Sequence, residues 1–169
     1  MDREMAGLDS AVMVLIEESS QSLILTQRSQ QLKNHPGEIC FPGGRWQAGD
    51  SDLYHTALRE LWEELGIDAG RVYSERPLTM ERTLTGFIIH PWLARIKTLT
   101  PCRLDNQEVA EVFRTPLSQV CKKANYQFIP VEREGLVFES CRYLGEPDRF
   151  VWGATARIMM QLCALDLTN

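Results

Sequence analysis

The stretch Arg59-Glu60-Leu61-Trp62-Glu63-Glu64-Leu65-Gly66-Ile67, preceded in the chain by Gly43-Gly44, decides how this sequence is interpreted. An α-helix turns roughly 100° per residue, so Glu60, Glu63 and Glu64 share one sector of its surface. Grouped carboxylate oxygens suit hard cations such as Mg²⁺, which prefer oxygen ligands. Taken alone, such a group is also compatible with a solvated acidic face.

An apolar stripe on the same helical wheel favours a helix that is packed on one side. The stripe lies nearly opposite the glutamates and consists of Tyr54, Leu58, Leu61 and Leu65. Leu53 and Ala57 fall on the acidic side, which predicts partial cover there too. The carboxylates are then caught between two packed flanks.

Capping residues predict where this helix begins and ends. Asp50 and Ser51 are N-cap candidates, and Gly66 is a terminator. The predicted helix covers residues 51–65.

Together, Gly44 and the run from Arg59 to Ile67 resemble the Nudix box, written Gx5Ex7REUxEExGU with U aliphatic. One residue more than the strict pattern separates Gly44 from Arg59, and Asp50 or Ser51 stands where the box has its mid-loop glutamate. The resemblance implies a Nudix hydrolase, an α/β protein with the Nudix-type α/β/α sandwich and a mixed sheet.

A second resemblance points to the coenzyme A diphosphatase branch of that family. It is carried by 23–29, 41–44 and 150–155, with Lys33, His35 and Gly37, and it spans about residues 11–163. Lys33 stands where the branch has an arginine, which keeps the charge but loses the bidentate fork. The implied reaction is hydrolysis of the diphosphate of CoA or acyl-CoA to 4′-phosphopantetheine (or its acyl form) and adenosine 3′,5′-bisphosphate.

Two alternatives stay open. The same chemistry could act on another nucleoside diphosphate derivative, such as a dinucleotide, an ADP-sugar or a nucleoside triphosphate. A Nudix module could also sense a nucleotide without cleaving it, although a sensor has no need of three intact glutamates.

The family resemblance also implies roles for individual residues. Glu60, Glu63, Glu64 and the backbone carbonyl of Gly44 would hold Mg²⁺ or Mn²⁺, which neutralises phosphate oxygens and lowers the pKa of a bound water. Arg59 would pair with Glu63 or Asp50 and orient the ligands. The expected catalytic residues are Glu63, Glu64, Glu108 and Arg59.

The general base is the least determined role. A box glutamate can accept the proton, and so can a glutamate from a later loop, where Asp105, Glu108 and Glu111 are candidates. We select Glu108, because a segment similar to Asn106-Gln107-Glu108-Val109 recurs in the coenzyme A diphosphatase branch that the chain resembles; an exposed acid at the start of a helix is the competing interpretation.

Three basic residues before the glycine loop are candidates for substrate binding. Arg28, Lys33 and His35 concentrate positive charge in an otherwise acidic protein, which suits a multiply phosphorylated small molecule. Solvated loop charges are the alternative, and His35 could instead cap a local turn.

Length and composition indicate one domain, residues 1–169, because 169 residues with 44% apolar content suffice for a full core. A net charge of −5 without a basic block argues against nucleic acid as a partner. No apolar run reaches membrane-spanning length, and Met1-Asp2-Arg3-Glu4 does not resemble a signal peptide. We expect a cytoplasmic enzyme with a small-molecule substrate, no membrane partner and possible homodimers.

The five cysteines are odd in number and scattered, without a CxxC pair. Zinc sites need closely spaced ligand pairs, so we expect reduced, mostly buried thiols.

Apolar periodicity predicts the remaining elements. We expect strands over 11–17, 22–27, 76–83 and 87–96, a short extended segment over 37–41, a hairpin over 126–131 and 135–143, and a closing helix over 151–165. Residues 108–113 and 116–122 are ambiguous.

Overall fold

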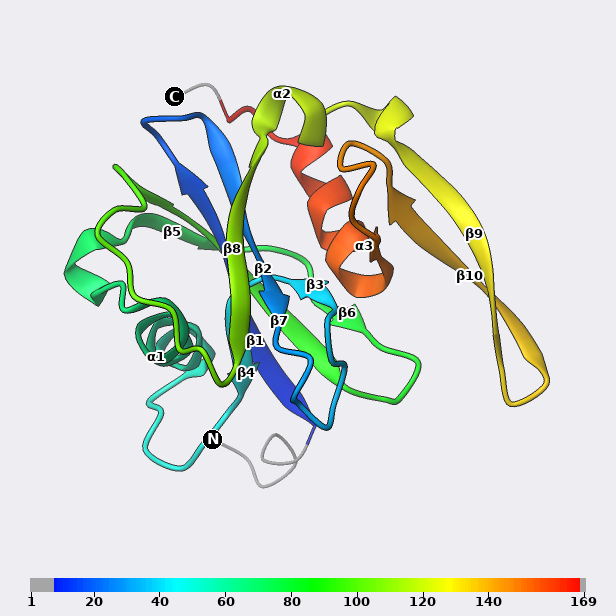
Figure 1. The fold of residues 1–169 in the computed structure, drawn as a ribbon, viewed down its shortest axis with the longest axis horizontal. Helices are drawn as coiled ribbons and strands as arrows, with labels where there is room; N and C mark the ends of the chain where they lie inside the picture. Colours follow the sequence, from blue (N-terminus) through cyan, green and yellow to red (C-terminus); the bar gives the residue numbers. More distant parts are fainter. Residues whose placement is uncertain (1–7, 168–169) are drawn as a thin grey trace.

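A computed structural model describes residues 8–167 (Figure 1). Its main sheet has eight strands: β1 (Asp9–Glu17), β2 (Ser22–Arg28), β3 (Ile39–Cys40), β4 (Gly43–Arg45), β5 (Tyr73–Pro77), β6 (Glu81–Arg82), β7 (Ile88–Ile96) and β8 (Val109–Pro116). Only β1 and β7 run parallel among the described pairings, so the sheet is mixed.

The sheet divides beside β1, and this division positions the site. Strand β2 pairs with the end of β1 at Ile16 and Glu17, whereas β4 pairs with its beginning. Strand β3 pairs with β2, but β4 pairs with β1. The short segment between β3 and β4 therefore passes from the β2 side of the sheet to the β1 side. At the crossing the Met13 N–H donates to the carbonyl of Pro42 at 2.8 Å.

Helices cover both faces of this sheet. Met13 and Leu15 of β1 are fully buried in the core beneath α1 (Leu53–Leu65). Val14 and Ile16 are fully buried in the second core, beneath α3 (Gly153–Gln161). Because side chains alternate along a strand, the continuous apolar run of β1 serves both layers. The predicted α/β/α sandwich is confirmed.

The ends of α1 agree only partly with the expectation from sequence. The N-cap is Asp52, whose carboxylate accepts the His55 N–H at 2.8 Å, so the helix starts later than residue 51. Neither Asp50 nor Ser51 caps it, because the Asp50 carboxylate is engaged by Arg59. Gly66 ends the helix as predicted, with φ 65° and its N–H on the Trp62 carbonyl.

Leu53 and Ala57 are covered, as predicted, but separating them from the core side of the helix was wrong. Ala57 is completely buried in the core under α1, and Leu53 packs against that core. The buried face is therefore wider than the four-residue stripe, as is usual for a helix lying on a sheet.

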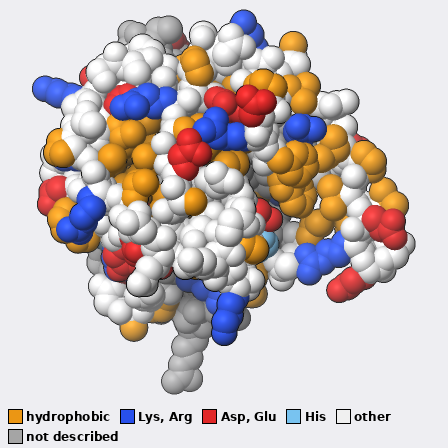
Figure 2. All heavy atoms as spheres, in the orientation of Figure 1, with side chains coloured by type: hydrophobic (Ala, Val, Ile, Leu, Met, Phe, Trp, Pro, Cys, Tyr) orange, Lys and Arg blue, Asp and Glu red, His pale blue; other side chains and the backbone are white. Residues whose placement is uncertain are grey.

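A second sheet, order β11-β10-β9, carries the predicted hairpin. It consists of β9 (Tyr126–Arg133), β10 (Leu136–Tyr143) and β11 (Val151–Trp152). Glu134 and Gly135 both have positive φ, as a two-residue turn of this kind requires. The hairpin projects from the body, and apolar side chains gather along it, including exposed Phe128 and Val137 (Figures 1 and 2).

Two other segments differ from expectation. The strand predicted over 76–83 is two short strands, β5 and β6. The closing helix is shorter than 151–165, because β11 precedes α3 and a 3₁₀ turn, η3 (Leu162–Ala164), follows it. The ambiguous segments form β8 and the short α2 (Leu117–Val120). The other 3₁₀ turns are η1 (Ala69–Arg71) and η2 (Lys123–Asn125).

All five thiols are free, but only Cys141 is buried and the other four are partly exposed, so "mostly buried" was too strong. None of the helices within residues 8–167 has the length and apolar character needed to cross a bilayer. The Met1–Glu4 segment, used in the expectation about a signal peptide, lies outside the described residues.

Candidate active site

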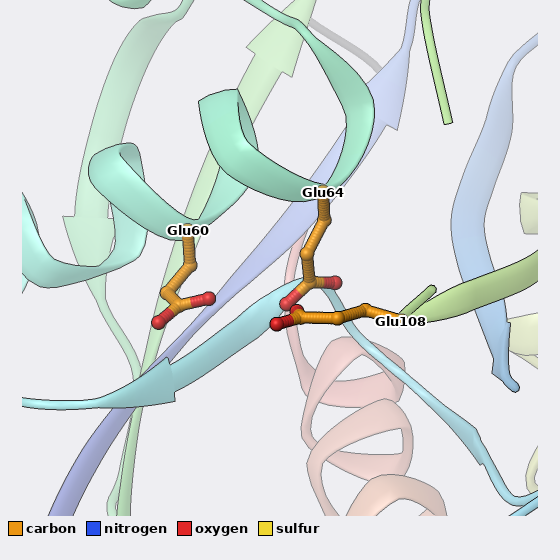
Figure 3. A group of neighbouring side chains, drawn as sticks. All are labelled: Glu60, Glu64 and Glu108. Atoms are coloured by element: carbon orange, nitrogen blue, oxygen red, sulfur yellow. The ribbon is translucent and has the colours of Figure 1, made fainter. Parts of the chain in front are cut away.

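Three glutamate side chains meet beside the glycine loop (Figure 3). Glu60 and Glu64 lie one turn apart on α1, and Glu108 lies just before β8. Each offers a carboxylate oxygen, and these oxygens lie within 4.8 Å of one another. Glu60 and Glu64 are 8% and 6% exposed, whereas Glu108 is exposed. Two buried acids and one accessible acid thus form a single group.

A β-bulge brings Glu108 to this group. Gln27 pairs with Glu111 but its neighbour Arg28 pairs with Val109, so one residue of β8, Ala110, is extra. Bulges re-aim side chains. Here the bulge lets Val109 join the core under α1, while Phe113 further along β8 faces the α3 side.

The turn before β8 is fastened to the end of α1. The Asp105 N–H donates to the Glu64 carbonyl at 2.9 Å, and the Asp105 carbonyl accepts the N–H groups of Glu108 and Val109 at 3.0 and 2.8 Å. Backbone hydrogen bonds thus hold Glu108 in register with Glu64.

Gly43 and Gly44, on the other side of the cluster, lie so close to neighbouring atoms that neither position has room for a side chain. The Gly43 N–H donates to Glu64 Oε1 at 3.3 Å. A Cβ on Gly44 would collide with the Glu60 carboxylate, and one on Gly43 would collide with the Ala11 carbonyl oxygen. Only glycine therefore lets β4 lie against both β1 and the glutamates.

Burial and mutual repulsion act on the two helix glutamates. Removal from water raises the pKa of Glu64, and the neighbouring Glu60 carboxylate raises it further. Burial also raises the pKa of Glu60, although the Arg59 guanidinium opposes that shift. The surrounding protein therefore supplies too few positive charges and hydrogen-bond donors to stabilise both Glu60 and Glu64 in their ionised forms.

Arg59 connects this cluster to the loop before α1. Its guanidinium donates to Asp50 from Nε at 2.9 Å and from Nη2 at 3.1 Å, a bidentate pair. It also donates to Glu60 at 3.0 Å and to the Arg45 carbonyl at 3.0 Å. The hydrogen bonds from Arg59 lower the pKa of Asp50 to about 2. The predicted Arg59–Asp50 pairing is confirmed, and Asp50 takes the place of the missing mid-loop glutamate as its partner.

Glu63 lies apart from the three clustered glutamates. Its side chain is 47% exposed and accepts a hydrogen bond from Arg59 at 3.3 Å. This contact is one of the two pairings predicted for Arg59. The side chains of residues 60 and 64 point toward the glycine loop, whereas that of residue 63, on the same helix, points toward solvent. In this arrangement Glu108 supplies the third carboxylate, and the metal and catalytic roles of Glu63 stay predictions.

The basic residues are only partly brought to the site. Arg28 pairs in the sheet with Val109, next to Glu108; its Nη2 donates to the Asn34 carbonyl at 3.0 Å, and its Nε is buried without a partner among residues 8–167. Lys33 is exposed. His35 is also exposed and lies 3.1 Å from Glu38, with φ 52° in a turn.

The donor set fits a divalent cation. Three carboxylates converge, two of them buried with raised pKa values, and a neighbouring loop leaves space that a Cβ at Gly44 would fill. All the side-chain donors are oxygens, which is the preference of Mg²⁺ and Mn²⁺. A cation bound here would offset the excess of negative charge.

Comparison with known proteins agrees with this geometry. The NUDIX domain model matches residues 7–133, and the chain belongs to this family. Nudix hydrolases act on phosphoanhydrides of nucleoside diphosphate derivatives and typically use a divalent metal.

Among the chain's relatives is an uncharacterized Nudix hydrolase, NudL, of Yersinia pestis, 32% identical over 142 residues, which are 83% of this chain and 70% of the relative. NudL of Yersinia pseudotuberculosis matches to the same extent.

Solved structures confirm the fold. The NUDIX domain of Shewanella oneidensis NrtR complexed with ADP ribose has a TM-score of 0.53 at 23% identity, over 71% of this chain and 80% of that chain. A C. elegans Ap4A hydrolase binary complex has a TM-score of 0.52 at 20% identity, over 64% and 80%.

Proposed function

We propose that this protein hydrolyses the diphosphate linkage of coenzyme A or acyl-CoA. The cluster of Glu60, Glu64 and Glu108 supports the hydrolysis, because it groups ligands for a cation with one accessible carboxylate. The signature segments support CoA as the substrate: residues 23–29 lie in and just after β2, and 41–44 form the crossing to β4 beside the glutamates. The products are 4′-phosphopantetheine, or its acyl form, and adenosine 3′,5′-bisphosphate.

Each residue has a part in this reaction. Glu60 and Glu64, with the carbonyl of Gly44, would hold Mg²⁺ or Mn²⁺, whose charge neutralises the diphosphate oxygens and acidifies the attacking water. Glu108, the exposed member of the cluster, would accept the proton of that water as the water oxygen bonds to phosphorus. The bond from phosphorus to the bridging oxygen then breaks, and the second phosphate leaves.

Arg59 acts as a positioning residue. Its contacts with Asp50, Glu60 and Glu63 link three carboxylates through one guanidinium, which sets the rotamer of Glu60. Because the Arg59 guanidinium already donates to these three carboxylates, we assign it no contact with substrate.

Arg28 supports CoA as the substrate most directly among the basic residues. Its buried, unpartnered Nε lies on the strand that pairs with Val109, next to Glu108. We propose that Arg28, with Lys33 and His35 from the loop that follows, contacts the anionic oxygens of CoA, including its 3′-phosphate.

The first test is a substrate panel of CoA, NADH, ADP-ribose and nucleoside triphosphates with Mg²⁺ or Mn²⁺, with products resolved by mass. CoA should be cleaved most efficiently, and excess EDTA should abolish the reaction. Arg28→Ala should raise KM for CoA by one to two decades, the size of a lost charge-assisted hydrogen bond of about 1.5–3 kcal/mol. For 3′-dephospho-CoA the rise should be much smaller, and an equal loss on both would assign Arg28 to the diphosphate.

A second candidate substrate is another nucleoside diphosphate derivative. The NUDIX domain of NrtR, which shares the fold, is complexed with ADP ribose in its structure. Faster cleavage of ADP-ribose or NADH than of CoA would favour this candidate, and binding without cleavage of any of them would favour a nucleotide sensor. A homodimer stays a prediction, for which sedimentation is the measurement.

A further inference from the structure

A cavity of about 580 Å³ lies on the α3 side of the main sheet, and the proposed reaction does not use it. Its walls come from five segments: Gln27 of β2, Pro36–Ile39, Glu111 of β8, Asp148–Phe150 and Trp152. A volume of this size is typical of small-molecule sites.

The cavity is close to the glutamate cluster along the strands. Gln27, which lines the cavity, is the neighbour of Arg28 on β2. Glu111, which also lines it, follows Glu108 by three residues, so about 10 Å of strand separates Glu111 from Glu108. The bulge at Ala110 turns Glu111 toward the α3 side, while Val109 packs under α1. A substituent on a diphosphate bound at the cluster can therefore extend around the end of β2 into the cavity.

The charge of the lining argues against a phosphate there. Three carboxylates, on Glu38, Glu111 and Asp148, line the cavity with one guanidinium, on Arg149; a second guanidinium, on Arg142, lies 4.9 Å from the centroid of the Phe150 ring. Arg149 is already paired with Glu111 at 2.7 Å and Glu146 at 3.3 Å. The positive end of α3, worth about half an elementary charge, does not offset the remaining excess.

The rest of the lining suits an uncharged, flexible group. Phe150 and Trp152 stack with ring centroids 5.7 Å apart, and Phe150 is half exposed. Carboxylate oxygens beside an aromatic wall accept amide N–H groups while the rings cover alkyl segments.

We infer that this cavity binds the neutral, amide-containing arm of the substrate, of the pantetheine kind. The phosphorylated adenosine then lies on the side of Arg28. This inference rests on the proposed function, because it assigns the two halves of a CoA-type substrate to two sides of the site.

Direct binding tests the assignment without any reaction. Pantetheine and adenosine 3′,5′-bisphosphate are titrated separately into wild type, Phe150→Ala and Phe128→Ala, with binding followed by NMR. Phe128 is a matched control, since it is an exposed phenylalanine on β9 outside this cavity. Phe150→Ala should weaken pantetheine binding about three- to tenfold, the loss of an aromatic contact, and leave the bisphosphate unchanged. Equal effects of the two variants, or a loss confined to the bisphosphate, would overturn the assignment.

The sign of a charge change gives a second test. Asp148→Lys should not lower KM for CoA, because a neutral arm has no charge for the lysine to attract; the loss of one amide acceptor should leave KM equal or raise it a few-fold. A KM several-fold lower would mean that a CoA phosphate lies in the cavity, and the inference would be wrong. If Phe150→Ala weakens pantetheine binding but CoA is not cleaved, the proposed activity fails alone. If CoA is cleaved with the same KM in Phe150→Ala and Phe128→Ala, only the cavity assignment fails.

Discussion

Two of the sites at which residues 8–167 bury a carboxylate treat its negative charge in opposite ways. Glu17, at the end of β1, is 1% exposed and is fully partnered. It accepts from Arg114 Nε at 2.5 Å and Nη2 at 3.1 Å, from the Leu99 N–H and from the Ser20 hydroxyl. These hydrogen bonds, that of Arg114 first, lower its pKa to about 2.

Glu64 is nearly as deeply buried, at 6% exposed, but its pKa shifts upward. Among residues 8–167, one N–H, that of Gly43, donates to the Glu64 carboxylate, and the neighbouring carboxyl groups are those of Glu60 and Glu108. The fold therefore stabilises an ionised glutamate where the role is structural, and leaves the clustered glutamates short of positive charge. This difference supports the proposal that the cluster binds a divalent cation.

The largest expected effect is on turnover. Glu64→Gln keeps the shape and the hydrogen bond from Gly43 but removes a cation ligand, so kcat should fall by about 10²–10⁴-fold while the protein stays folded. Steady-state kinetics and circular dichroism measure the two properties. Near-normal turnover would sink the assignment of Glu64.

Glu63→Gln is the informative comparison for that experiment. A loss as large as that of Glu64→Gln would show that Glu63 also holds a cation or activates water. A much smaller loss would restrict Glu63 to its contact with Arg59.

The next effect is on stability, at Glu17. Glu17→Gln removes the charge that Arg114 pairs with; because the Arg114 side chain is 43% exposed and can be solvated, the free energy of unfolding should fall by about 1–3 kcal/mol, the value of charge-assisted hydrogen bonds. Glu81→Gln, which removes a single pair with Arg157 at 22–30% side-chain exposure, should cost less than about 1 kcal/mol. Urea unfolding compares the two variants, and equal costs would contradict the special status of Glu17.

The pH dependence of stability should show the same contrast. The folded pKa of Glu17 is below its ordinary value of 4.5, so its contribution is present above pH 4.5 and lost as pH falls toward about 2. The loss should approach about 3 kcal/mol. Wild type should therefore show this acid limb, and Glu17→Gln should flatten it. An identical acid limb in both proteins would rule out this ion pair as its cause.

The smallest effect has the opposite sign. The raised pKa of Glu64 means that metal-free protein loses stability as pH rises above 4.5 through the folded pKa. In EDTA at pH 8, Glu64→Gln should be more stable than wild type by about 1–3 kcal/mol, the cost of an unsatisfied buried group. Added Mg²⁺ should reverse the order, because it binds only the native wild-type site. Lower stability of Glu64→Gln in EDTA would show that the ionised form is already well stabilised.

Much of the site could be predicted because its signals are local in the sequence. The helix of Glu60 and Glu64, its end at Gly66 and the pairing of Arg59 with Asp50 depend on residues within one segment of chain. Glu108 was selected by resemblance, and the structure places it beside the other two. Its part as the base stays a prediction.

The remainder depends on contacts between distant segments. A helical wheel gives the angle of Glu63 around the helix but not which segments pack against that side. It therefore could not show that Glu63 is exposed whereas Glu60 and Glu64 are buried. Nor could it show that the sheet covers Ala57. The bulge at Ala110 and the cavity beside Phe150 arise from the pairing of β2 with β8 and from loops far apart in sequence, which periodicity does not encode.

Cation binding tests the central claim most directly. Mn²⁺ titrated into metal-free protein and followed by electron paramagnetic resonance reports the site without substrate or turnover. Wild type should bind Mn²⁺, and both Glu60→Gln and Glu64→Gln should weaken binding by more than about tenfold, while Glu17→Gln should bind as wild type does. Unchanged Mn²⁺ affinity in Glu60→Gln and Glu64→Gln would contradict the claim that these buried glutamates form the metal site.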